Sequence, residues 1–182
     1  MATGLPAAKF ATVFAANDFG VRARIIAFPF TSDKEVLFSD WAEQFKKLNA
    51  KNEISGVKLI LDGTPVEGLA AVSLPYTNMP GSFGRINFDE ITIRKYINFC
   101  LQQKQQIMVH AVGDSTIHSF IRILRTMHPD AFWKDKRVRL EHGDLAIMKA
   151  GDFAMLKQLG LIIVVNPTHF AIPHLIGPRL GG

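Results

Sequence analysis

The feature that most limits the possible folds is an alternation of short apolar runs with longer amphipathic segments. Five runs are rich in branched aliphatic side chains and too short for helices: residues 21–28, 56–61, 106–110, 137–141 and 161–165. Most of them are apolar on both faces, which is typical of strands buried in a parallel sheet. The runs therefore predict five parallel strands.

Four segments between these runs carry apolar residues every three or four positions, as amphipathic helices do: residues 33–48, 88–101, 115–127 and 145–159. Asn87 and Glu90 are placed as a capping pair for the second helix, and Gly160 predicts the end of the fourth. Strands alternating with helices in this rhythm predict right-handed βαβ units and a parallel sheet, and hence an α/β fold.

The length of 182 residues allows one domain with a sizeable core but falls short of a complete barrel of about 250 residues. We therefore expect a single domain over residues 1–182, which as a barrel would be partial. Residues 62–84 are rich in glycine and proline, and this segment is much longer than the usual strand-to-helix loop of about 2–6 residues. Long loops after the carboxyl ends of parallel strands hold the sites of such folds, so this loop is expected on the substrate side.

Composition argues against several classes of partner. The net charge is +5, but the basic residues are scattered and no recognition motif accompanies them, so no nucleic-acid partner is expected. The longest apolar runs are too short to span a bilayer, so no membrane partner is expected either. Cys100 is the only cysteine and lies in a helical apolar pattern, which indicates packing and fits a reducing compartment, with the cytoplasm favoured.

Polar residues follow the predicted strands at their carboxyl ends. His110 follows residues 107–109, and Glu141 and His142 follow residues 138–140. Neighbouring parallel strands lie about 4.8 Å apart, so two imidazoles at their ends can meet at one metal ion. His110 and His142 are therefore the candidate ligands of a divalent metal ion. Asp114, one turn beyond His110, and Glu141 could orient an imidazole.

The pattern leaves alternatives open. A single histidine at a strand end is often only hydrogen-bonded structure, whereas two at equivalent ends, each beside a carboxylate, favour function. Lys58 lies inside an apolar strand, where an uncompensated ammonium group is costly. Its side chain either enters the barrel mouth and serves a site or reaches solvent. His118 and His128 fall on predicted helices and are interpreted as surface or packing residues.

An ordered set of motifs resembles amidohydrolase family 3, a branch of the metal-dependent amidohydrolase superfamily. The matching pieces are Val57-Lys58 through Asp62-Gly63-Thr64-Pro65, Leu74-Pro75-Tyr76, His110-Ala111-Val112-Gly113-Asp114, Arg139-Leu140-Glu141-His142 and Asn166-Pro167-Thr168-His169. Each piece alone is weak, but their order and spacing are specific, and the resemblance extends from about Val21 onward.

The resemblance implies that the chain covers about strands three to seven of an eight-stranded TIM barrel of the metal-dependent hydrolase type. It implies that His110 and His142 are metal ligands and that Lys58 is the strand-four position where a carboxylated lysine bridges two metals in binuclear members. It further implies catalytic roles for Lys58 and Asp114. Tyr76, Asn166 and His169 would then bind the substrate. The implied reaction is hydrolysis of a non-peptide, amide-type C–N bond in a small molecule, with one or two divalent ions, zinc being favoured.

Two parts of the family pattern have no counterpart: the His-x-His pair of the first strand and the aspartate of the eighth. Asn166 also replaces the commoner glutamine. The resemblance therefore implies a central fragment that holds part of a metal site. Two other readings stay open, namely a non-catalytic βα domain with a structural or binding role, and a metal-free enzyme that uses His and Asp as acid and base. Exposed strand edges at residues 21–28 and 161–165 would favour a homo-oligomer.

Overall fold

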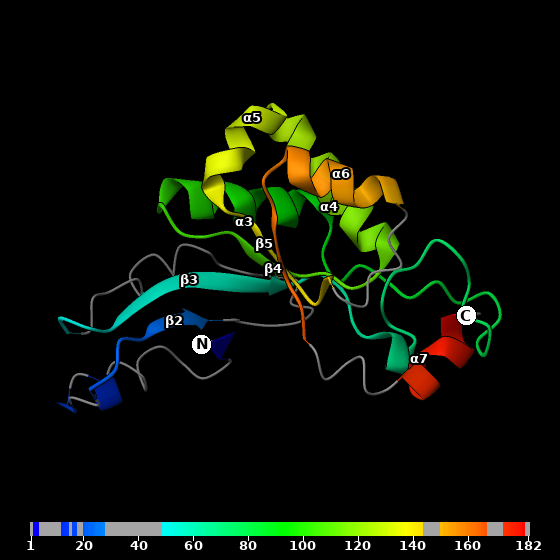
Figure 1. The fold of residues 1–182 in the computed structure, drawn as a ribbon, viewed down its shortest axis with the longest axis horizontal. Coiled ribbons are helices and arrows are strands. Elements are labelled where there is room, and N and C mark those ends of the chain that lie inside the picture. The colour runs from blue at the N-terminus through cyan, green and yellow to red at the C-terminus, as the bar shows by residue number, and fades with distance from the viewer. Residues whose placement is uncertain are drawn as a thin grey trace.

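The structure is a computed structural model that describes residues 2–3, 12–14, 16–17, 20–27, 49–143, 150–166 and 173–180. Its strands are β1 (Ala2–Thr3), β2 (Arg24–Ala27), β3 (Glu53–Ile60), β4 (Met108–His110), β5 (Arg139–Glu141) and β6 (Ile162–Val164). Its helices are η1 (Pro65–Glu67), α3 (Glu90–Gln102), α4 (Asp114–Met127), α5 (Asp130–Trp133), η2 (Lys134–Lys136), α6 (Ala150–Gln158) and α7 (Pro173–Leu180). The strands are all parallel and lie in chain order across one sheet (Figure 1). This succession of parallel strands and helices is that of a partial (β/α) barrel.

All five predicted strands are confirmed, and they form β2 to β6. The strand β1 was not predicted, because two residues are too few to show any periodicity. It pairs with β2, with Ala2 opposite Ile26, so the expectation that residues 21–28 form an edge of the sheet is wrong. The strand β6 lies at the other end of the described sheet, as expected. The helix predicted over residues 33–48 lies outside the described residues.

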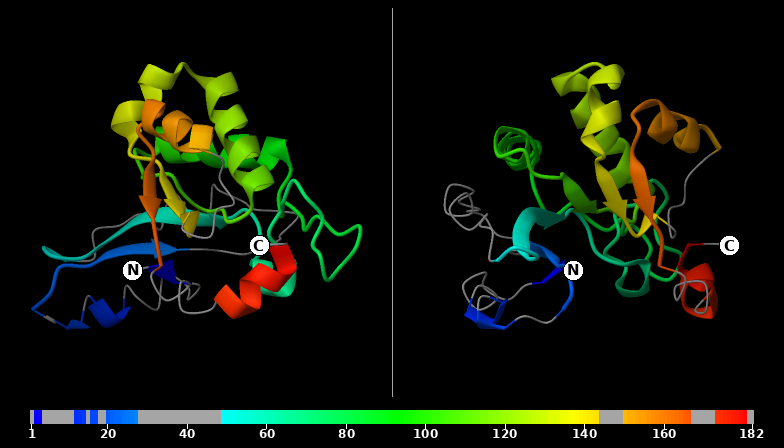
Figure 2. Two further views of the ribbon diagram at one scale, coloured as in Figure 1. Left: turned by 45° about the vertical axis from the view of Figure 1, so that its right-hand side comes forward. Right: turned by 60° about the vertical axis from the view of Figure 1, so that its left-hand side comes forward.

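The two faces of the sheet differ in polarity. Helices α3 to α6 cover one face (Figures 1 and 2). Alternate strand residues, such as Leu59, Val109 and Leu140, pack on that face in the main apolar core. The residues between them point to the opposite, concave face. Because Ile60 pairs with His110 and His110 with Glu141, the concave face collects polar side chains at the carboxyl ends of the strands.

The helix α3 begins differently from the prediction. Asp89 is its N-cap, and the Asp89 carboxylate accepts a hydrogen bond of 2.7 Å from the backbone N–H of Thr92. Asn87 instead donates its side-chain amide to the carbonyl of Ile60 at 3.0 Å. The expected pairing of Asn87 with Glu90 is therefore wrong, and Asn87 ties the loop before the helix to the end of β3.

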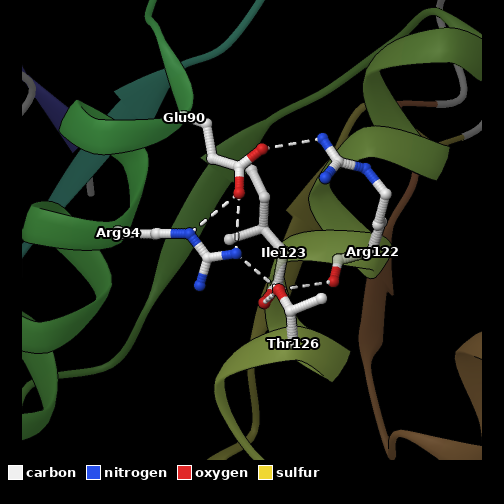
Figure 3. A network of polar contacts seen from close by, with 5 residues as sticks. All are labelled: Glu90, Arg94, Arg122, Ile123 and Thr126. Carbon is white, nitrogen blue, oxygen red and sulfur yellow. Dashed lines mark hydrogen bonds and ion pairs between the residues drawn. The ribbon is translucent and has the colours of Figure 1, made fainter.

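Glu90 takes part in a network that joins α3 to α4 (Figure 3). Its carboxylate binds Arg94 of its own helix at 2.7 Å and Arg122 of α4 at 2.8 Å. Thr126 accepts a further hydrogen bond of 2.5 Å from Arg94. These groups are partly solvent-exposed, so each pair adds little to stability by itself. The network serves mainly to set the position of the two helices relative to each other.

The histidines on the helices have packing roles, as the sequence indicated. His118 of α4 lies 2.7 Å from the buried carboxylate of Asp152 in α6. The His128 ring stacks on Phe132, with 3.9 Å between ring centroids. Both contacts hold helices together on the covered face of the sheet. None of the helices in the described part of the chain is long and apolar enough to cross a membrane.

Tyr96 and Cys100 of α3 are completely buried against the sheet. The Tyr96 hydroxyl lies 2.7 Å from the carbonyl of Val57 and 2.8 Å from that of Met108, and it accepts a 2.9 Å hydrogen bond from the N–H of Met108. It therefore connects the two strands β3 and β4. Burial raises the pKa of the Cys100 thiol to about 12, which keeps it protonated and fits a packing role.

Candidate functional site at the carboxyl ends of the strands

The structure brings His110 and His142 together. His110 is the last residue of β4 and His142 follows β5, and their ring centroids lie 4.7 Å apart at an interplanar angle of 55°. Consecutive strand residues point to opposite faces, so Glu141 and His142 would normally diverge. His142 has a φ of 67°, a left-handed conformation that is uncommon outside glycine. This turn takes the chain out of the strand pattern and places the His142 ring beside His110.

Lys58 lies on the concave face of β3 and is only 7% exposed, so its side chain points into the barrel and not to solvent. Its Nζ lies 3.7 Å from Oε2 of Glu141, and Oε1 of Glu141 lies 2.8 Å from the guanidinium of Arg139. Burial lowers the pKa of Lys58, and the neighbouring Glu141 carboxylate opposes that shift. Glu141, predicted to orient an imidazole, is thus held between two cationic side chains.

Asp62, the residue directly after Leu61, connects the loop after β3 to the turn after β4. The sequence alone did not identify it as a site residue. Its carboxylate is completely buried. It accepts hydrogen bonds from the backbone N–H groups of Ala71, Val112 and Gly113 and from the hydroxyl of Thr116, at 2.8–3.2 Å. Burial raises its pKa, and these hydrogen bonds oppose the shift. The sequence feature that could have identified Asp62 is a carboxylate followed by glycine directly after a buried strand.

The loop over residues 62–84 is folded onto the start of α4. Backbone hydrogen bonds join Val72 to Phe83 and Tyr76 to Ser82 within it. A Cβ added to Gly113 would lie 1.9 Å from the carbonyl oxygen of Ala71. Only a residue without a side chain allows this approach. The loop also lies against α7 (Figure 1). There the Thr77 hydroxyl donates a hydrogen bond to the carbonyl of Pro178.

Two predicted site residues are engaged by this loop. Asp114, the first residue of α4, accepts a 2.8 Å hydrogen bond from the N–H of Ser73 and a further one from its hydroxyl. The carboxylate that lies against His110 is instead that of Asp62, 3.7 Å from Nε2. Tyr76 is buried and donates its hydroxyl to the carbonyl of Ala70 at 2.8 Å. Burial raises the pKa of Tyr76 to about 12, so it stays neutral.

The remaining predicted substrate-binding residues come from the segment after β6. Asn166 directly follows Val165 beyond this strand and is half-buried. His169 lies outside the described residues. The structure therefore groups Lys58, His110 and His142 with Glu141 on the concave face, and leaves the substrate-binding assignments as predictions.

The histidine pair fits part of a metal site. Two nitrogen ligands of a tetrahedral zinc ion lie about 3.3 Å apart. Two imidazoles whose centroids lie 4.7 Å apart and whose planes are tilted by 55° can each place one ring nitrogen at this spacing. Within residues 49–143 and the other described ranges, no group of three or more His, Cys, Asp and Glu side chains is arranged to hold a metal ion. These residues thus offer two imidazoles and, beside them, Lys58.

Comparisons with known proteins agree with this architecture. The chain is similar to two solved structures, each titled an uncharacterized metal-dependent hydrolase. The one from Pyrococcus furiosus has a TM-score of 0.72 and 21% identity, over 88% of this chain and 32% of that chain. The one from Pyrococcus horikoshii OT3 has a TM-score of 0.68 and 20% identity, over 87% of this chain and 30% of that chain. The chain thus spans about a third of the length of these structures.

At this level of identity the likeness concerns the fold. No curated protein matches the chain. A family model described as "Amidohydrolase family" matches residues 7–181, nearly the whole sequence. The resemblance that the strand-end motifs indicated is therefore confirmed, and the chain belongs to the amidohydrolase family.

Proposed function

We propose that this chain carries part of the active site of a metal-dependent hydrolase that cleaves a non-peptide, amide-type C–N bond in a small molecule. The observation that carries the proposal is the pair of imidazoles, His110 and His142, in contact at the carboxyl ends of two adjacent parallel strands. In barrels of this kind the catalytic residues come from that end of the strands. Membership of the amidohydrolase family and the likeness to proteins titled metal-dependent hydrolases support the same reaction class.

In this proposal His110 and His142 hold a divalent ion through ring nitrogens, and Lys58 lies on the same face of the sheet as a third group. Zinc is the expected ion because imidazole nitrogens suit it well. A divalent ion supplies polarisation of the substrate carbonyl and an activated water near neutral pH. Glu141 keeps Lys58 in place through their 3.7 Å ion pair. The loop over residues 62–84 borders the site and is expected to contact substrate.

Replacing either histidine by alanine is expected to lower the affinity for zinc at least about 100-fold, because each substitution removes one of the two imidazole ligands in this proposal. Isothermal titration of the metal-free chain with zinc, and with cobalt followed by its visible absorption, measures this. His128→Ala, at the C-terminal end of α4 and away from the carboxyl ends of the strands, is the matched control and should bind metal as the original chain does. Metal binding that is unchanged in His110→Ala and in His142→Ala would refute the proposal.

A second candidate is a non-catalytic βα domain with a structural or binding role. The observation in its favour is that the described residues contain no group of three His, Cys, Asp or Glu side chains suited to a metal ion. It predicts that the chain folds equally well with and without divalent ions. The thermal midpoint with and without zinc separates the two candidates, because a ligand that binds only the native state raises that midpoint.

We also propose that the chain self-associates through β6. This strand lies at the end of the described sheet, and its residues Ile162, Ile163 and Val164 are only half-buried. Unpaired backbone groups along such an edge favour pairing with another strand. Replacing Ile163 by lysine is expected to shift the chain toward the monomer in light scattering. A chain that is already monomeric at high concentration would contradict the proposal.

A further inference from the structure

We propose that Asp62 is a positioning residue for His110, one that sets which ring nitrogen of His110 carries the proton. The inference rests on the proposed function only in giving His110 a ligand role. It starts from the distribution of hydrogen bonds around a carboxylate that is completely shielded from solvent. A buried carboxylate needs hydrogen-bond partners, and Asp62 has four.

The two oxygens of Asp62 are used unequally. Oδ2 accepts three hydrogen bonds, from the N–H groups of Ala71 and Gly113 and from the hydroxyl of Thr116. Oδ1 accepts one of 3.0 Å, from the N–H of Val112, and lies 3.7 Å from Nε2 of His110. An ionised carboxylate oxygen has about two acceptor sites. Oδ1 therefore has capacity left on the side that faces the imidazole.

Asp62 also holds the backbone that follows His110. Val112, Gly113 and Thr116 belong to the turn between β4 and α4 and to the first turn of α4, two to six residues beyond His110. Their three hydrogen bonds to one carboxylate limit how far this turn can move. The Leu61 N–H, from the residue before Asp62, donates a 3.0 Å hydrogen bond to the carbonyl of His110 itself. The position of the imidazole is thus coupled to Asp62 through the backbone as well as through the ring.

The charge of the Asp62 carboxylate determines which nitrogen of the His110 imidazole carries the proton. An ionised carboxylate can only accept, so it favours a proton on the imidazole nitrogen that faces it. The separation of 3.7 Å is longer than a hydrogen bond, and the effect there is the attraction between the N–H dipole and the buried charge. His110 is then expected to carry its proton on Nε2 and to present the lone pair of Nδ1. Carboxylates that orient metal-binding histidines act in this way.

The test is nitrogen NMR of the metal-free chain labelled at histidine, at about pH 8.5, well above the ordinary imidazole pKa of about 6.5. In the original chain, Nε2 of His110 is expected to show the pyrrole-like signal of a protonated nitrogen, and Nδ1 the pyridine-like signal. In Asp62→Asn, the amide oxygen takes the place of Oδ2 with its three donors. The amide nitrogen then takes the place of Oδ1, where it cannot accept the hydrogen bond from the Val112 N–H and faces Nε2 as a donor. The preferred protonation is therefore expected to move to Nδ1.

Two variants separate positioning from a general loosening of the fold. Ser73→Ala removes a loop contact to Asp114 without touching Asp62, and Asp152→Asn replaces the buried partner of a different histidine, His118. Both should leave the His110 signals unchanged. The proposal is overturned if Nε2 of His110 is pyridine-like in the original chain, a result that needs no variant to fold. It is equally overturned if Ser73→Ala moves the His110 signals as much as Asp62→Asn does.

A metal titration of the same samples keeps this proposal apart from the proposed function. Asp62→Asn is expected to lower cobalt affinity about 10-fold to 100-fold, the usual effect of losing a group that orients a metal-binding histidine. If the original chain binds no cobalt but shows the expected protonation of His110, the proposed function fails and the role of Asp62 stands. If cobalt binds but Nε2 is pyridine-like, the role of Asp62 fails and the metal site stands.

Discussion

Replacing Gly113 by alanine is expected to lower the free energy of unfolding by about 3 kcal/mol, the upper part of the usual range for overpacking. The added Cβ would lie 1.9 Å from the carbonyl oxygen of Ala71 and 2.5 Å from its carbonyl carbon. Both are backbone atoms of a loop fixed by Asp62, so they cannot move aside cheaply. The loop over residues 62–84 would have to separate from the start of α4. Urea denaturation followed by circular dichroism measures the change.

Gly151→Ala is the matched control for this prediction. Gly151 lies in α6, and beyond its chain neighbours and the backbone of its own helix no heavy atom would lie within 4 Å of its added Cβ. Alanine is favoured over glycine within helices by about 0.5–1 kcal/mol, so this variant should be as stable as the original chain or slightly more stable. Equal stability of the two alanine variants would show that the loop does not approach α4 as closely as described.

Tyr96→Phe is expected to lower the free energy of unfolding by about 2 kcal/mol, although it removes a single oxygen atom. The hydroxyl contacts the carbonyls of Val57 and Met108 and accepts from the N–H of Met108. A buried polar group left without its partner costs about 1–3 kcal/mol. Because these groups belong to β3 and β4, the substitution also loosens the strands that carry Lys58 and His110. The same denaturation experiment measures the loss of stability.

Tyr76→Phe provides the comparison. Tyr76 is also buried, but its hydroxyl makes one described hydrogen bond, to the carbonyl of Ala70 within the same loop. The Tyr76→Phe substitution is expected to lower the free energy of unfolding by about 1 kcal/mol, the usual net value of a single hydrogen bond. A larger loss for Tyr76→Phe than for Tyr96→Phe would contradict the view that Tyr96 links the two strands.

The arrangement of strands and helices could be predicted because it follows from local periodicity. Apolar runs buried on both faces indicated β2 to β6, and the stripe along residues 115–127 indicated α4 (Asp114–Met127). Gly160 was expected to end a helix, and its φ of 63° after α6 confirms this. The two-residue strand β1 and the N-cap Asp89 were missed. The first is too short for a pattern, and for the second Asn87 offered an equally plausible cap in the sequence.

The candidate site was predictable in part for a related reason. Residues at the carboxyl ends of neighbouring parallel strands must lie near each other, so the sequence placed His110 and His142 together. Asp62 follows a strand in the same way but was not selected for the site. Its partners lie 9 to 54 positions further along the chain, and no local pattern records them.

The sequence by itself determined the class of fold, the order of the strands and the family, because these depend on short-range periodicity and on motifs in a set order. Only the tertiary structure decided which side chains form ion pairs or hydrogen bonds with one another. Lys58 could have reached solvent, but the pairing of β3 with β4 and of β4 with β5 left it beside Glu141. Asp114 follows β4 and Asp62 follows β3, so both carboxylates lie beyond the carboxyl ends of adjacent strands. The path of the loop over residues 62–84 assigned Asp114 to Ser73 and left Asp62 against His110, because a carboxylate binds the donors that the folded backbone brings to it.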